Sequence, residues 1–163
     1  MKISPELLIT KDQDILQKRI LVTGLDEVCI KRVTDFIVNK FKGNNYYIDT
    51  SETINQNLSG DLFSDKKVLF LLTGFKGKIK DLEITDTDNQ SILISNTNNT
   101  KTNTLKAVFS KAKEDLLVEC YPLNRSAKEF IIKNFIKEND LDISSDVFWF
   151  IVDTFDSNYV LLE

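Results

Sequence analysis

At 163 residues, with 42% hydrophobic residues, the chain is long enough for one domain with a real core, or for one domain and part of another. A net charge of −4 argues against tight, unaided nucleic-acid binding, and the absence of histidine excludes histidine general bases and histidine-ligated metals. Cys29 and Cys120 match no metal or redox spacing; a disulfide between them is one alternative, and two buried free thiols are the expected state.

Strands and helices alternate over the first 121 residues. Short apolar runs bounded by turn residues are typical of strands buried on both faces, and apolar stripes at helical spacing indicate helices between them. Strands are expected at residues 19–23, 46–49, 68–72, 91–95 and 116–120. Helices are expected at 3–9, from 26 or 27 to 42 with Gly43 as the stop, and at 51–58, 80–83 and 105–113, with 96–104 as a polar loop. This alternation predicts an α/β fold with a mostly parallel sheet.

Only helices are expected after Pro122. Ser126 and Glu129 fit a capping box that opens a helix to about residue 138, with inward-facing side chains at Phe130, Ile131 and Phe135. Ser144 is expected to cap a helix over 146–155, and Ser157 to begin a third. We therefore divide the chain into an α/β domain over residues 1–121 and the start of a helical domain over residues 122–163, and we expect a partial protein.

The turn after the strand at 19–23 is where a phosphate-binding loop would lie. Gly24 is present, but such a loop needs Gly, Lys and Ser or Thr where Cys29, Ile30 and Lys31 stand. Without the second glycine the backbone cannot curl around a phosphate, and Ile30 cannot replace the lysine charge. Gly74-x-x-Gly77-Lys78 has the wrong spacing and is interpreted as a flexible basic loop. The residues predict a degenerate phosphate loop, with no catalytic residues, nucleotide cofactor or metal.

Leu62 and Phe63 form an apolar pair inside a polar segment, just ahead of the buried strand at 68–72. One interpretation tucks the pair under the sheet, because most large apolar residues are buried. The other exposes the pair as an anchor for another protein. The pair is the leading candidate for a binding site.

Three motifs, residues 20–27 (ILVTGLDE), 61–72 (DLFSDKKVLFLL) and 118–123 (VECYPL) ahead of an amphipathic helix, resemble the delta subunit of the bacterial DNA polymerase III clamp loader. The resemblance covers the whole chain. It implies an AAA+-like parallel sheet with flanking helices and a degenerate phosphate loop, followed by a partial all-helical lid domain. The family's C-terminal collar domain would be absent.

The resemblance also implies a function. The chain would be a non-catalytic subunit of the DNA polymerase complex that binds and opens the beta sliding clamp for loading onto primed DNA. Leu62 and Phe63 would enter the clamp's hydrophobic pocket. The family often has an apolar wedge residue two positions before that Leu; here Gly60 stands there, with Leu58 two further back, so the wedge departs from the family pattern.

Other partners follow from the same resemblance. In the full-length protein the other clamp-loader subunits would bind, but this chain alone would not join them stably without a collar. Primer-template DNA would bind weakly, within the complex, facing lysines at 76, 78, 101, 106, 111 and 113. We expect a cytoplasmic protein with no membrane partner, because residues 1–6 lack a signal-peptide core and no apolar run is long enough to span a bilayer.

Two alternatives come from other classes. A small α/β enzyme acting on a nucleotide or phosphorylated metabolite would bind its ligand at the carboxyl ends of the strands. The absence of histidine and of a phosphate loop counts against it. The third interpretation is a structural adaptor in another assembly.

Overall fold

The computed structural model describes residues 1–10, 15, 17–50, 66–77, 89–97 and 100–157. The chain divides into two compact units, Met1–Cys120 and Tyr121–Glu163. Among the helices in these described residues, none combines the length and apolarity that crossing a membrane requires.

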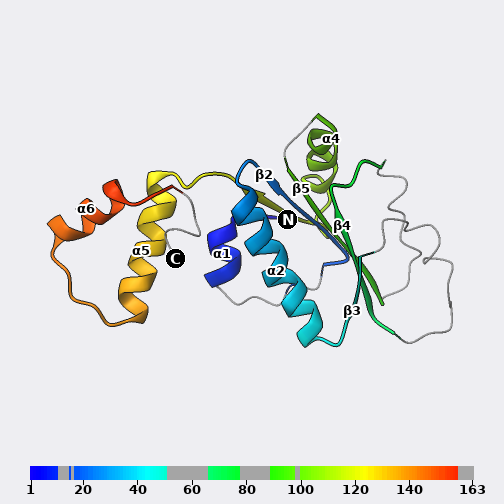
Figure 1. Cartoon of the computed structure of the whole chain (residues 1–163), viewed down its shortest axis with the longest axis horizontal. Coiled ribbons are helices and arrows are strands. Elements are labelled where there is room, and N and C mark those ends of the chain that lie inside the picture. The colour runs from blue at the N-terminus through cyan, green and yellow to red at the C-terminus, as the bar shows by residue number, and fades with distance from the viewer. Residues whose placement is uncertain (11–14, 16, 51–65, 78–88, 98–99, 158–163) are drawn as a thin grey trace. The chain divides into compact units, whose positions relative to one another are not determined.

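The first unit is built on a six-stranded sheet in the order β1-β6-β2-β5-β4-β3, with every pair of neighbours parallel. Its strands are β1 (Lys2–Ile3), β2 (Arg19–Gly24), β3 (Tyr47–Asp49), β4 (Val68–Thr73), β5 (Gln90–Thr97) and β6 (Leu116–Cys120). Its helices are α1 (Pro5–Thr10), α2 (Glu27–Gly43) and α4 (Thr100–Phe109). Helices α1 and α2 cover one face and α4 the other (Figure 1). The expected α/β fold with a parallel sheet and flanking helices is confirmed.

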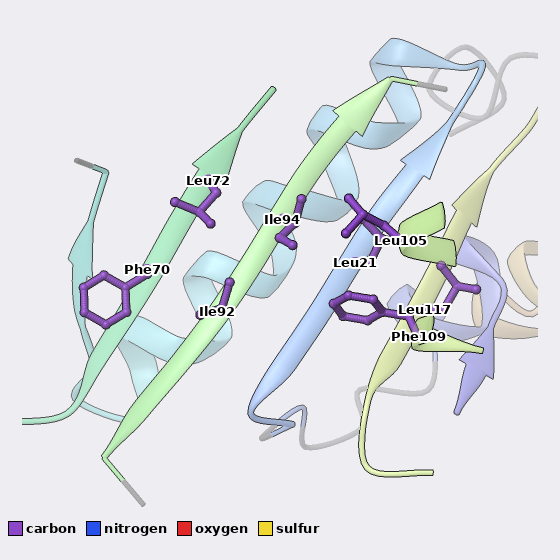
Figure 2. Close-up of a cluster of buried hydrophobic side chains, with 8 residues drawn as sticks. All are labelled: Leu21, Phe70, Leu72, Ile92, Ile94, Leu105, Phe109 and Leu117. Atoms are coloured by element: carbon purple, nitrogen blue, oxygen red, sulfur yellow. The ribbon is translucent and has the colours of Figure 1, made fainter. Parts of the chain in front are cut away.

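The central strands are apolar along their length because helices cover both faces. Alternate residues of four strands meet the apolar side of α4, and Figure 2 shows this cluster: Leu21, Phe70, Leu72, Ile92, Ile94, Leu117, Leu105 and Phe109. The residues between them face the other way, where α2 contributes its own buried stripe of Ile30, Val33, Ile37 and Phe41. The helical spacing of that stripe in the sequence predicted this packing correctly.

The prediction of a polar loop over residues 96–104 is wrong. Strand β5 continues through Asn96 to Thr97, and α4 already begins at Thr100. The buried Thr102 hydroxyl donates to the Thr97 carbonyl oxygen at 3.2 Å, which ties the helix start to the strand end. Tertiary contacts override the weak helix propensity of Asn and Thr at this point.

Two further boundaries differ from the prediction. Helix α2 runs through Gly43, and the cap is Asn44, whose backbone N–H donates to the Lys40 and Phe41 carbonyl oxygens. Asn45, at φ 64°, supplies the left-handed residue expected from the glycine. The leading helix expected from residue 3 begins only at Pro5, because Lys2 and Ile3 pair with β6 as β1.

The second unit contains α5 (Arg125–Glu138) and α6 (Ser145–Thr154). Ser144 caps α6 as predicted, but α5 is capped by Asn124, whose side-chain oxygen accepts the Ala127 N–H at 2.9 Å, and not by a box at Ser126. Phe135, expected to point inward, is 55% exposed, whereas Lys128 and Ile132 are the buried residues of that helix. The helices expected at 51–58, at 80–83 and beyond Ser157 lie outside the described residues.

Candidate functional site

The turn between β2 and α2 is the place in this fold where a phosphate would be bound. Only Leu25 and Asp26 separate the two elements. Gly24 pairs with Cys120 of β6, and a Cβ atom added to Gly24 would lie 1.7 Å from the Cys120 carbonyl oxygen. The two backbones are therefore so close that only glycine fits.

The polar groups of this turn are already engaged. The backbone N–H groups of Leu25 and Asp26 both donate to the Cys120 carbonyl oxygen, at 2.9 and 3.2 Å. The buried Asp26 carboxylate accepts the Cys29 N–H at 2.9 Å and so caps α2. A phosphate loop would offer such amides, and the helix N-terminus, to an anion. Here a carboxylate of the chain itself holds that position, so the residues do not fit a nucleotide phosphate.

Cys29 and Cys120 meet beside the same turn. Both are free and buried, as expected from the sequence, and their side chains are close enough to interact. That contact and burial raise the pKa of the Cys120 thiol. Sequence spacing gave no signal for the contact, because it depends on β6 lying next to β2.

Glu119, next to Cys120, links two lysines. Its carboxylate is paired with Lys2 and with Lys106, the latter at 3.1 Å. Burial acts to raise the pKa of Glu119, but the hydrogen bonds and charges of the two lysines outweigh it and hold that pKa below its ordinary value. Lys106 was expected to face DNA phosphates; in the structure its side chain is 15% exposed and its ammonium group is paired with Glu119.

The segment after β4 is held at its start. The Asn96 side chain accepts the Phe75 N–H at 2.7 Å and donates to the Phe75 carbonyl oxygen at 3.0 Å. Gly74 donates to the Ser95 carbonyl oxygen at 3.0 Å, at a left-handed φ of 66°. The expected flexible basic loop is therefore anchored to the end of β5 as far as Phe75.

The sequence-predicted clamp-binding residues Leu62 and Phe63, with the wedge positions Leu58 and Gly60, lie outside the described residues. What the structure places is the chain that follows them. Lys66 and Lys67 are exposed, and the Lys67 carbonyl oxygen accepts the Tyr47 N–H at 2.8 Å. The Lys67 ammonium group also lies 5.6 Å from the centre of the Tyr46 ring. The segment thus enters β4 at a fixed point.

Within the part of the chain that the structure describes, no group of three or more Cys, Asp or Glu side chains is arranged to hold a metal ion.

No family model and no curated protein matches the chain. Among solved structures, it is similar to DnaA from Aquifex aeolicus with bound AMPPCP, at 17% identity and a TM-score of 0.48, over 96% of this chain and 56% of that one. It is also similar to the Thermotoga maritima RuvB Holliday junction branch migration motor, at 11% identity and a TM-score of 0.42, over 96% and 55%. The chain thus spans little more than half the length of these proteins.

Proposed function

We propose that this chain is a clamp-loader delta-type subunit, which binds and opens a ring-shaped sliding clamp for loading onto primed DNA. The three sequence motifs that resemble this family support the proposal. The observation that carries it is the closed β2–α2 turn, in which Gly24, Leu25 and Asp26 are packed and hydrogen-bonded against Cys120. An AAA+-like sheet whose phosphate turn is closed is suited to a binding role that needs no nucleotide chemistry.

The alternative of a nucleotide-dependent enzyme is disfavoured by the same turn. A ligand phosphate would have to displace two hydrogen bonds to the Cys120 carbonyl oxygen and approach the Asp26 carboxylate. Like charges at such short range repel, and the buried carboxylate would lose its helix-capping bond. We therefore expect no saturable ATP binding at micromolar concentrations. Isothermal calorimetry checks this, and saturable binding would support the enzyme instead.

The binding residues in this proposal are Leu62 and Phe63. The ladder that fixes Lys67 and Val68, including the Val68 N–H donated to the Asn89 carbonyl oxygen at 2.8 Å, holds the chain a few residues after the pair. Anchoring near a binding residue limits the entropy that docking removes. Lys66 and Lys67 are exposed, so the chain between the pair and β4 ends in two charged residues.

The test is the double variant Leu62→Ala with Phe63→Ala, measured against purified sliding clamp by surface plasmon resonance. Apolar anchors typically lose about 2 kcal/mol or more on truncation to alanine, roughly a thirtyfold weakening for each. Clamp binding at micromolar concentrations should therefore disappear. The melting temperature should change little, because exposed residues contribute little to stability.

A matched control uses the same two residue types elsewhere. Leu25 and Phe150 are 66% and 67% exposed, so the double variant Leu25→Ala with Phe150→Ala removes the same atoms from other surfaces. It should bind the clamp like the unmodified chain. A strongly destabilised Leu62/Phe63 variant would place that pair in the core, and a stable variant with unchanged clamp affinity would refute the proposed site.

A further inference from the structure

Two cysteines far apart in the sequence meet at the closed turn. Cys29 lies in the first turn of α2, and Cys120 ends β6. Their side chains are 1% and 0% exposed and are close enough to interact. The proposed clamp-binding function uses neither thiol.

The backbone of each cysteine is held in place by hydrogen bonds to the β2–α2 turn. Cys29 is fixed through its N–H, which donates to the Asp26 carboxylate at 2.9 Å. Cys120 is fixed through its carbonyl oxygen, which accepts from Leu25 and Asp26, and through its register with Gly24. Asp26 takes part in both sets of bonds, so both cysteines are hydrogen-bonded to the same turn. Folding therefore raises their effective concentration toward each other far above that in the unfolded chain.

We propose that Cys29 and Cys120 are a redox pair that forms an intramolecular disulfide by exchange with a low-molecular-weight disulfide such as oxidised glutathione. One cysteine thiolate attacks a glutathione sulfur and releases one glutathione thiol, forming a mixed disulfide. The second cysteine attacks the protein sulfur of that mixed disulfide and releases the second glutathione. Two protein thiols are oxidised, one glutathione disulfide is reduced to two thiols, and the two protons pass to them.

The disulfide would tie the start of α2 to the end of β6. Cys120 is the last residue of the first compact unit, so the bond would fix the point at which the chain leaves the sheet. Exchange in the folded chain should be slow. The thiolate is the reactive form, whereas burial and the neighbouring thiol raise the pKa of Cys120. The two thiols would thus become oxidised under sustained oxidising conditions or during oxidative folding.

The experiment equilibrates the unmodified chain in mixtures of reduced and oxidised glutathione, with and without denaturing urea. Acid quenching, alkylation and intact mass then separate the intramolecular disulfide, which takes up no alkyl group, from the dithiol, which takes up two. At the same concentrations of reduced and oxidised glutathione, the disulfide-to-dithiol ratio should be at least about tenfold higher in the folded chain than in urea. A folded-state ratio equal to or below that in urea would overturn the proposal, as would mixed or intermolecular disulfides as the main products.

Two controls complete the test. Cys29→Ala should form no intramolecular disulfide and only a mixed disulfide at Cys120, which peptide mapping identifies. In the unmodified chain, the melting temperature should be higher for the purified disulfide form than for the dithiol, because a bond that folding favours also favours folding. A lower melting temperature would show that the contact does not accommodate the bond, and would refute the pair as a redox site.

Discussion

The two compact units bury their apolar residues very differently. In the first unit, the central strands are covered by helices on both faces, and Phe109 of α4 is 1% exposed within the cluster of Figure 2. In the second unit, α6 is apolar around most of its circumference, yet Val152 is its buried residue while Val147, Trp149 and Phe150 are exposed.

The difference shows where apolar residues stabilise this chain. A parallel strand makes its backbone bonds to neighbours on both edges and packs side chains on both faces, so every residue in a central strand contributes to one core. A pair of helices buries only the stripe at which they meet. An apolar run in the first unit is therefore structural, whereas one in α6 leaves a surface.

The largest effect expected from this comparison comes from the same substitution in the two units. Phe109→Ala should lower the free energy of unfolding by about 3–5 kcal/mol, because it leaves a cavity under the sheet. Phe150→Ala, at 67% exposed, should change that free energy by less than about 0.5 kcal/mol. Urea unfolding followed by circular dichroism measures both, and Trp149, the chain's only tryptophan, reports on the second unit. Equal losses would remove the distinction between the units.

A smaller but still large effect is expected at the closed turn. Gly24→Ala places a methyl group on the Cys120 carbonyl oxygen and should cost about 3 kcal/mol or more, because two backbones must separate. Gly43→Ala is the matched control: a Cβ there meets nothing within 4 Å, and alanine in a helix gains about 0.5–1 kcal/mol over glycine. Thermal unfolding of both variants decides the point. If Gly24→Ala were tolerated, the turn would be open enough to reconsider a ligand there.

The smallest effect concerns ion pairs. The pKa of Glu119 is lowered in the folded state, so its pairing stabilises the fold above the ordinary carboxyl pKa of 4.5 and is lost as pH falls through the lower, folded value. Glu119→Gln should cost about 0.5–1 kcal/mol at pH 7, and the difference from the unmodified chain should vanish in acid below that folded value.

The matched control for this prediction lies in the second unit. Asp153 pairs with Arg125 at 3.2 Å with both side chains exposed, so Asp153→Asn should change stability by no more than a few tenths of a kcal/mol. Urea titrations of both variants at neutral and acid pH measure the difference. A pH-independent loss for Glu119→Gln would mean that packing, and not charge, is what the residue supplies.

Much of the fold was predictable because its signals are local. The strands at 19–23, 68–72 and 116–120 were located to within a residue, since an apolar run bounded by turn residues fits a strand that is buried on both faces. Ser144 was identified as a helix cap for the same reason: a cap is formed with a backbone amide three residues away. The cap at Asn124 was missed because Ser126 and Glu129 offered an equally good local pattern two residues later.

The candidate site was predictable only in part. The missing glycine and lysine at Cys29 and Ile30 predicted a degenerate phosphate loop. Its physical form, a two-residue turn with its amides bound to Cys120, involves a strand near the other end of the α/β unit. The clamp-binding pair Leu62 and Phe63 remains a prediction made from the sequence.

The sequence by itself determined most of the strands and helices of the α/β unit, the parallel pairing that their alternation favours, and the replacement of the phosphate-loop residues at Cys29, Ile30 and Lys31. Periodicity, capping residues and side-chain chemistry act within a few residues of the chain, so they can be identified from the amino-acid sequence alone. Only the tertiary structure decided that β6 lies beside β2, that β1 extends the sheet edge, and that Cys29 meets Cys120. These pairings depend on which apolar faces can be buried together, and that choice is made by the whole core at once.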